Sequence, residues 1–326
     1  NIGFGLHSIE DTVCDKKWFP YNKGGDFRKW YGNNDYIVNF QNKGREVCNY
    51  IDATSAVNSK GRVINREHYF HECISWSLIS SSNIAFRYKQ NGFIFDVAGM
   101  SCFAEHNTLI YLLGLNNTKV VRIIMNTLAP TINYQVGDIA NIPVIFDKEK
   151  SQEIFDIVEE NIEYGKKDWD SFETSWDFIS NPLITYRSGV GYKDVPMNKW
   201  QFKIADAFRS WQNSAEAKFN ILKVNEEELN RIFIEIYGLQ DELTPEVEDK
   251  DVTVSKADLQ RDIKSLISYA VGCMFGRYSL DVDGLAYAGG EWDDNKYTTF
   301  IPDKDNCIPI TDEEYLEDDI VGLFVA

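Results

Sequence analysis

The feature that most constrains the fold is the stretch 18–31, in which aromatic and basic residues surround a pair of glycines. At its centre lies Asn22-Lys-Gly-Gly-Asp26. Paired glycines predict a turn, because they adopt positive φ without a Cβ clash. Lys23 stands on this turn, and Arg28 and Lys29 follow it between flat rings. Cations and rings beside exposed backbone suit a phosphate chain and unstacked bases. The competing interpretation is a hairpin whose rings are core and whose charges are solvated.

Charge is divided unevenly along the chain. The net charge is −18, of which residues 1–146 contribute +2 and residues 147–326 contribute −20. A strongly acidic surface repels a polyanion, so the second half cannot provide an extended nucleic-acid-binding face. If nucleic acid is the partner, residues 1–146 must bind it.

Size and composition indicate a globular protein. The 326 residues are enough for two domains, and 44% hydrophobic and 14% aromatic content argue against disorder. No apolar run approaches the ~18 residues of a membrane span, so we expect no membrane partner. The six cysteines are widely spaced without a CxxC pair, which is typical of the reducing cytoplasm. Residues 1–5 have neither an initiator Met nor signal-peptide features, so we expect a segment of a longer protein.

Residues 1–146 show the patterns of short strands mixed with helices. Strands are predicted at 36–40, 73–79, 84–92, 93–97, 99–103, 131–136 and 139–145, and helical spacing occurs at 45–51, 53–57 and 119–128. Asn91-Gly92 predicts a hairpin that pairs 84–92 with 93–97. On the first of these strands, Arg87 and Lys89 should share one face, opposite Tyr88.

The second half is mainly helical. Helices are predicted at 151–165, 200–224 and 225–237, with a further one that opens at 255–258 and runs to about 278. Asn225 should cap a separate helix, with Glu228 at its third position. The patterns together predict an α+β fold. A mixed α/β domain with short strands occupies residues 1–146, a helical connector 147–245, and a C-terminal region of helix and loop 246–326.

The sequence offers little for catalysis. His68 and His71 are three residues apart and could share a helix face toward a metal, but no HExxH motif is present and ordinary roles are commoner. The glycine pairs at 24–25 and 289–290 match neither a phosphate loop nor a dinucleotide fingerprint. A nuclease is a weaker hypothesis, because no PD…(D/E)xK spacing stands out. We therefore expect no metal site.

Long blocks of the chain carry a family resemblance. They are 18–32, 82–87 (Ser-Asn-Ile-Ala-Phe-Arg), 93–97 (Phe-Ile-Phe-Asp-Val), 128–139, 225–233, 237–245 and 258–278. They resemble the region that follows the catalytic domain in the PglX family, the adenine-specific DNA methyltransferases of BREX anti-phage systems. Related blocks occur in type II enzymes that join methylation and restriction on one chain. The resemblance covers most of residues 1–300.

The resemblance implies target recognition. In the family, this region reads the DNA site, and the preceding domain transfers the methyl group from S-adenosylmethionine. Family members should carry an Asn-Pro-Pro-Tyr motif, but here Asn181-Pro182 is followed by Leu183-Ile184. We therefore expect no catalytic residue and no cofactor in this chain, and S-adenosylmethionine in the parent enzyme. The expected partners are double-stranded DNA, an N-terminal methyltransferase domain and other defence-system proteins.

Sequence-specific recognition of double-stranded DNA is thus the first hypothesis. Its basic and aromatic contacts would be Lys23, Arg28, Lys29, Trp30, Tyr31, Arg87 and Lys89. Asn133 and Gln135 join them, because side-chain amides pair with adenine in the major groove. Asn133 could instead satisfy a turn. The second hypothesis is a protein-interaction module, whose acidic half docks the methyltransferase, another defence component or a phage inhibitor.

Overall fold

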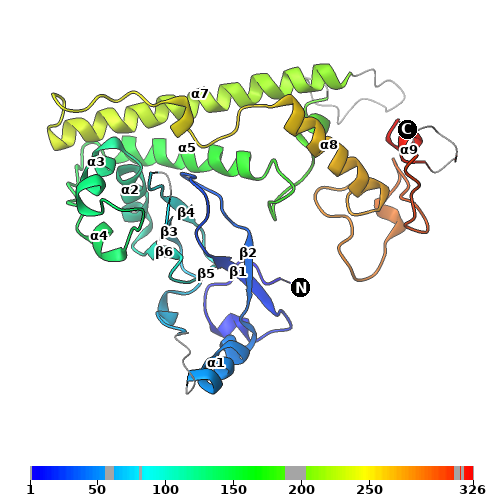
Figure 1. Cartoon of the computed structure of the whole chain (residues 1–326), viewed down its shortest axis with the longest axis horizontal. Helices are drawn as coiled ribbons and strands as arrows, with labels where there is room; N and C mark the ends of the chain where they lie inside the picture. The colour runs from blue at the N-terminus through cyan, green and yellow to red at the C-terminus, as the bar shows by residue number, and fades with distance from the viewer. Residues whose placement is uncertain are drawn as a thin grey trace. The chain divides into compact units, whose positions relative to one another are not determined.

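The computed structural model describes residues 2–55, 62–80, 83–187, 203–311, 316 and 319–325. The chain divides into two compact units (Figure 1). Unit 1 comprises residues 1–166 and 220–254, and unit 2 comprises residues 167–219 and 255–326. Both of the boundaries expected from the sequence, after residues 146 and 245, lie inside unit 1.

The described strands of unit 1 form two small sheets. They are β1 (Trp18–Asn22), β2 (Tyr36–Asn39), β3 (Cys73–Ser77), β4 (Arg87–Lys89), β5 (Ile94–Phe95) and β6 (Gly99–Cys102). One sheet has the order β2-β1-β5, with β1 antiparallel to β2 and parallel to β5. The other has the order β4-β3-β6 and is antiparallel throughout. These mixed short strands, followed by a helical region, confirm the predicted α+β class.

The predicted hairpin between 84–92 and 93–97 is wrong. The turn at Asn91-Gly92 forms, but β4 pairs with β3 and β5 pairs with β1. The backbone of Phe70 separates the two strands: its carbonyl accepts from Gly92 N at 3.0 Å, and its amide donates to Phe93 O at 2.8 Å. Ile94 then enters a core that includes Phe19 and Phe70. Burial of apolar side chains therefore decides the pairing, rather than the local turn signal.

Helices complete unit 1. They are α1 (Gln41–Ser55), α2 (His106–Asn116), α3 (Lys119–Leu128), α4 (Val136–Ala140), most of α5 (Ser151–Trp169) and the last part of α7 (Ile204–Tyr237). Short 3-10 turns lie at Glu10–Thr12, Arg66–His68 and Asp249–Asp251. Leu109, Leu113 and Leu115 of α2 are fully buried. Figure 1 shows α5 alongside the last part of α7, and Asn225 Nδ2 of α7 donates to Glu160 Oε2 of α5 at 2.7 Å.

Two predicted strands near residue 140 are absent from the described structure. Residues 131–136 contribute one isolated bridge, between Ile79 and Asn133, and 139–145 is not a strand. Instead, α4 begins after Gln135, whose backbone amide donates to Asp138 Oδ2 at 3.0 Å. This contact caps the helix, so Gly137 and Asp138 lie in the first turn of α4.

The prediction that a separate helix starts at Asn225 is also wrong, because α7 is continuous from Ile204 to Tyr237. Asn225 does not cap it, since its side chain donates to Glu160 and Asn161 of α5. Glu226, the residue that follows Asn225, is 3% exposed and has partners in the core of unit 1. Asn225 therefore makes tertiary contacts instead of capping, and Glu228 pairs with Arg231 of the same helix.

Unit 2 contains α6 (Pro182–Thr185), the first part of α7, α8 (Leu259–Met274) and α9 (Ile320–Val325), with a 3-10 turn at Asp294–Lys296. Asp258 caps α8 by accepting from Arg261 N at 2.7 Å. One core of this unit gathers Phe178, Tyr269, Cys273 and Tyr278. The predicted helix start at Trp200 lies outside the described residues.

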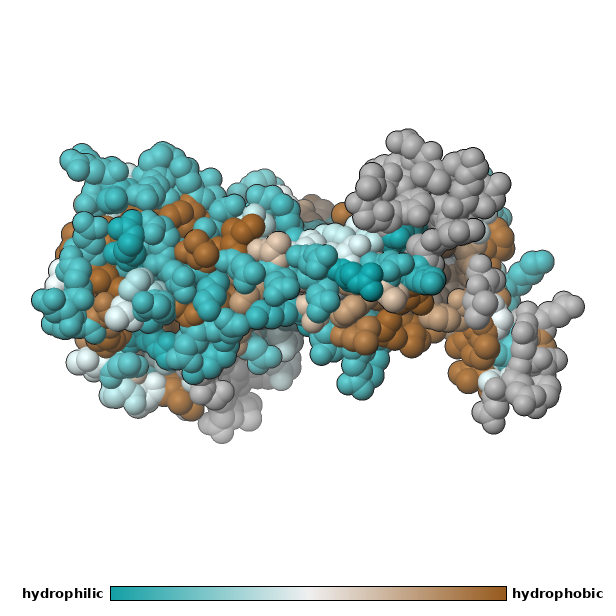
Figure 2. Space-filling model, turned by 90° about the horizontal axis from the view of Figure 1, so that it is seen from above, coloured by the Kyte–Doolittle hydropathy of each residue, from teal (hydrophilic) through white to brown (hydrophobic). Residues whose placement is uncertain are grey.

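The surface agrees with an amphipathic α7. Figure 2 shows a mainly hydrophilic face over the last part of this helix, broken by small hydrophobic patches. Within the described ranges, no helix has both the length and the hydrophobicity needed to cross a bilayer.

Candidate nucleic-acid interface

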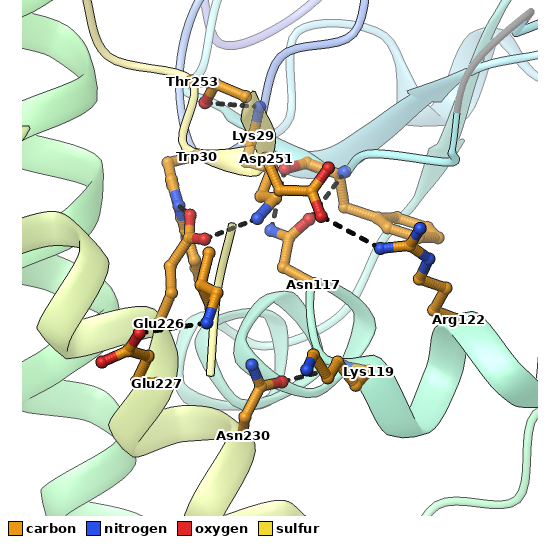
Figure 3. Close-up of polar contacts among 12 residues, drawn as sticks. Lys29, Trp30, Asn117, Lys119, Arg122, Glu226, Glu227, Asn230, Asp251 and Thr253 are labelled. Carbon is orange, nitrogen blue, oxygen red and sulfur yellow. Dashed lines mark hydrogen bonds and ion pairs between the residues drawn. The ribbon is translucent and has the colours of Figure 1, made fainter. Parts of the chain in front are cut away.

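Lys29 and Trp30 of the basic stretch are buried, and both depend on Glu226. Lys29 Nζ lies 2.6 Å from Glu226 Oε2, and Trp30 Nε1 donates to Glu226 Oε1 at 2.7 Å. Lys29 is 8% exposed and Trp30 1%. Figure 3 shows both side chains directed at the carboxylate from α7. The carboxylate therefore neutralises the cation and satisfies the indole at one point.

Arg28 and Tyr31 flank this pair and also have partners within unit 1. The Arg28 guanidinium donates to three carbonyl oxygens: Tyr31 O at 2.7 Å, Gly165 O at 3.1 Å and Thr253 O at 3.3 Å. Tyr31 is 4% exposed, and Lys166 Nζ lies 5.1 Å from the centroid of its ring. The stretch 28–31 thus joins β4, α5 and Thr253.

Arg87 and Lys89 share one face of β4, as predicted, but this face points inward. Each is 1% exposed. Lys89 Nζ donates to Gly32 O at 2.8 Å, to Asn33 O at 3.0 Å and to Asn34 Oδ1. Burial, with a smaller effect of Arg87, holds the pKa of Lys89 well below its ordinary value. This ammonium group therefore fixes the backbone that follows the basic stretch.

The Arg87 guanidinium performs a similar role nearby. It donates to Arg28 O at 3.2 Å and to Ser77 Oγ at 3.1 Å. Burial, followed by the charge of Arg28, lowers the pKa of Arg87 to about 10. Among the described residues, Arg87 Nε has no partner. A buried guanidinium costs desolvation energy, which its hydrogen bonds to the Arg28 carbonyl and the Ser77 hydroxyl offset in part.

The glycine turn presents Lys23 at the surface. Gly24 has φ 77°, and a Cβ on it would lie 2.6 Å from Ala98 O, so only glycine fits there. Gly25 is tied to the end of β3 by Ser77, whose hydroxyl accepts from Gly25 N at 3.0 Å and donates to Gly25 O at 2.7 Å. Lys23 is exposed, with Nζ 5.6 Å from the centroid of the Tyr36 ring. The turn is thus anchored while its cation faces solvent.

Asn133 and Gln135 are exposed beyond the same end of β3. Asn133 bridges Ile79, two residues after Ser77, and Tyr134 N donates to Leu78 O at 2.8 Å. The two amides contact each other, because Gln135 Nε2 donates to Asn133 Oδ1 at 2.9 Å. The structure therefore gathers Lys23, Asn133 and Gln135 around the end of β3. Of the other six predicted contacts, Arg28 is half-buried and the remaining five are buried.

A second group of polar residues was not predicted. The Asn117 side chain makes two hydrogen bonds to the backbone of Phe86. Its Oδ1 accepts from Phe86 N at 3.0 Å, and its Nδ2 donates to Phe86 O at 3.0 Å. Lys119 N donates to Asn230 Oδ1 at 2.8 Å, and Arg122 Nη1 lies 3.1 Å from Asp251 Oδ2 (Figure 3). The pocket that they line holds only about 40 Å³. The Lys119–Asn230 and Arg122–Asp251 pairs join residues more than 100 positions apart in the sequence, and Asn117 and Phe86 are 31 apart, so no local pattern reveals them.

No group of three or more His, Cys, Asp or Glu residues in the described ranges is arranged to hold a metal ion. His68 instead stacks on Phe103, with ring centroids 4.7 Å apart and an angle of 13° between planes.

Comparisons with known proteins place the chain among methyltransferase relatives. No family model matches it. It is 47% identical to the adenine-specific methyltransferase PglX of Lacticaseibacillus casei (strain Zhang) over 315 residues, 96% of this chain and 25% of that protein. It is 32% identical to the adenine-specific methyltransferase BrxX of Escherichia coli O9:H4 (strain HS), over 94% of this chain and 25% of that protein. The chain spans about a quarter of the length of these relatives, and the resemblance inferred from its sequence blocks is confirmed.

Proposed function

We propose a function from the premise that this chain is related, over nearly its whole length, to a segment of the adenine-specific methyltransferases PglX and BrxX. In this proposal the chain recognises a specific double-stranded DNA site for N6-adenine methylation in a phage-defence system, BREX or a related restriction-modification system. The 47% identity over 96% of the chain is the observation that carries it.

Lys23, Asn133 and Gln135 are the proposed direct contacts, because all three are exposed around the end of β3. Lys23 would bind a phosphate, on a turn whose backbone Ser77 holds in place. The contact between the two amides limits their rotamers, which favours readout of base edges over non-specific binding.

The buried members of the predicted set, together with the half-buried Arg28, have a supporting role in this proposal. Lys29 and Trp30 fix the stretch to Glu226, and Arg28, Tyr31, Arg87 and Lys89 fix its backbone. They act through the position of the glycine turn. Their loss should lower stability first and DNA affinity only as a consequence.

Methyl transfer is proposed to occur elsewhere in the parent enzyme, which would also bind S-adenosylmethionine. The Asn181-Pro182 pair does not fit a methyl-transfer site. Asn181 is 1% exposed, its Oδ1 accepts from Leu183 N at 2.9 Å, and its Nδ2 donates to Ser265 Oγ at 3.0 Å. A side chain used in this way to cap α6 cannot also bind a flipped adenine.

Fluorescence anisotropy with labelled duplexes tests the proposal. We expect Lys23→Glu to weaken binding about tenfold and to reduce the slope of log affinity against log salt by about one. Lys148→Glu makes the same charge change at another exposed position of unit 1 and is the matched control. Equal effects of the two variants, or affinity independent of salt, would contradict the role of Lys23.

The acidity of residues 147–326 supports a second candidate, a module that docks the rest of the methyltransferase, another defence protein or a phage inhibitor. It would act beside DNA recognition. Co-purification of this chain with the separately expressed remainder of the methyltransferase, at low and high salt, tests it. Capture that is lost at high salt supports charge-driven docking, and no capture at low salt contradicts it.

A further inference from the structure

A cavity of about 790 Å³ opens in unit 1 beside the sheet β2-β1-β5. Its volume falls in the range of small-molecule sites, roughly 300–1,000 Å³. Five aromatic side chains contribute to its wall: Tyr21, Phe40, Tyr69, Phe95 and Phe103. Aliphatic side chains such as Ile51, Ile64 and Val97 complete the apolar lining, and the rings offer faces on which a flat, unsaturated ligand can stack.

The rings at one side of the cavity form a stepped surface. Tyr69 meets Phe95 edge to face at 5.2 Å, and Phe95 meets Phe103 at 5.3 Å between centroids. His68 then stacks on Phe103 at 4.7 Å. Phe103 is half-buried and His68 is exposed, so this end of the aromatic wall reaches solvent. A planar group entering from solvent can stack on the outer face of this His68–Phe103 pair.

The cavity also contains a fixed hydrogen-bond acceptor. Asp96 Oδ2 accepts from Tyr21 Oη at 2.7 Å, and Asp96 Oδ1 accepts from Ala98 N at 2.8 Å and Gly99 N at 3.2 Å. An ionised carboxylate offers about four acceptor positions, so Oδ2 retains capacity for an N–H of a ligand. Arg62 also contributes to the lining and is exposed, which places a cation within reach of a phosphate.

The lining adjoins the residues assigned to DNA. Val136, which follows Gln135, is 50% exposed and lines the cavity. Tyr21, whose hydroxyl holds Asp96, is two residues before Lys23. A nucleotide displaced from a duplex bound at Lys23 and Gln135 would therefore have the cavity close by.

We propose that this cavity binds the purine base of a nucleotide, stacked on the His68–Phe103 wall, with an amino or ring N–H donated to Asp96 and the phosphate near Arg62. Two sources supply this chemistry: a free purine nucleotide, or a purine displaced from the bound DNA. Only the second source rests on the proposed DNA recognition.

Isothermal titration calorimetry of the full 326-residue chain with AMP, GMP and UMP tests the free nucleotide. We expect AMP or GMP to bind more tightly than UMP, because a two-ring base has the larger stacking surface. Because base binding weakens when a stacking ring is lost, His68→Ala should reduce affinity about tenfold. Val136→Trp should block the mouth, and Ile123→Trp, at an exposed position of α3 outside the lining, is the matched control.

Duplexes with 2-aminopurine at successive positions test the second source, because its fluorescence rises when it leaves the base stack. We expect a rise at one position, which Val136→Trp abolishes and Ile123→Trp preserves while duplex affinity remains. Purine binding without this rise identifies a free nucleotide as the source of the base. The rise without purine binding identifies displaced DNA as the source. Either outcome supports the site.

Absence of both signals, or signals that Val136→Trp leaves unchanged, would overturn the site. Purine binding by a chain that does not bind duplex DNA would overturn the proposed function and leave the cavity assignment intact. Salt-dependent duplex binding with neither cavity signal would overturn the cavity assignment and leave the proposed function intact.

Discussion

Glu226 is the single residue on which the basic stretch depends most, because its two oxygens hold Lys29 and Trp30. Removing one member of a buried ion pair leaves the other charge without compensation, at a cost of about 3–5 kcal/mol. We therefore expect Lys29→Met, which leaves the Glu226 carboxylate buried, to lower the free energy of unfolding by about this amount. Urea denaturation followed by tryptophan fluorescence measures the change.

The double variant Lys29→Met with Glu226→Gln separates charge from packing. Glutamine keeps an oxygen for Trp30 Nε1 but removes the charge, so the double variant should be more stable than Lys29→Met alone. Strictly additive losses would show that the two side chains do not act as a pair.

Asp281 provides a pH-dependent contact in unit 2. Burial raises the pKa of its carboxyl, but the Thr299 amide and hydroxyl and the Thr298 amide outweigh this effect and lower the pKa to about 2. Because the folded-state pKa lies below the ordinary value of 3.8, this carboxylate stabilises the fold above pH ~4 and the contribution is lost as pH falls toward 2.

Because Asp281 is exposed and solvent screens its interactions, Asp281→Asn should cost about 1 kcal/mol or less at pH 7, through its weakened hydrogen bonds. Thermal unfolding at pH 7 and at pH 2–4 measures this. The variant should approach the stability of the parent chain as the pH falls. A difference that stays constant down to pH 2 would show that the carboxylate charge contributes nothing.

At the level of elements, local patterns predict some helices and strands, but they fail at 131–136, 139–145 and Asn225, and they do not predict which partners an element packs against. The helical spacing at 119–128 matches α3. Its buried residues, Val120, Val121 and Met125, recur at the spacing of one helix face. Arg87 and Lys89 were placed on a common face by the period of a strand, but that period cannot say which face is buried. Their acceptors come from residues 28–34 and from Ser77, so only the assembled structure reveals that they are internal.

The continuity of α7 makes a prediction about backbone protection. In a separate helix starting at Asn225, the first four amides would lack partners within the helix and exchange rapidly. In the continuous helix they bond to the preceding turn. Hydrogen exchange should therefore find residues 225–228 protected at least about tenfold over an unstructured chain. Rapid exchange confined to these residues would restore the two-helix interpretation.

For the whole molecule, the division of charge along the sequence does not coincide with the compact units. Residues 220–254 return to unit 1 and bring acidic groups that pair with cations of the leading half, as Glu226 does with Lys29 and Asp251 with Arg122. The small positive excess of residues 1–146 therefore overstates the cationic surface of unit 1. We accordingly expect DNA binding to release few counterions and to rely on a small number of exposed contacts such as Lys23.

The same organisation predicts how the chain can be shortened. A fragment of residues 1–146 keeps both sheets but loses Glu226, Gly165 and Thr253, which hold the stretch 28–31. The Lys29 charge and the Trp30 indole would then be unsatisfied, and a fragment that ends at residue 254 would restore their partners. We expect 1–254 to unfold cooperatively in urea and 1–146 to show no cooperative transition by circular dichroism. Equal midpoints for the two fragments would instead establish the leading half as an independent domain, with the partners from α7 dispensable for its fold.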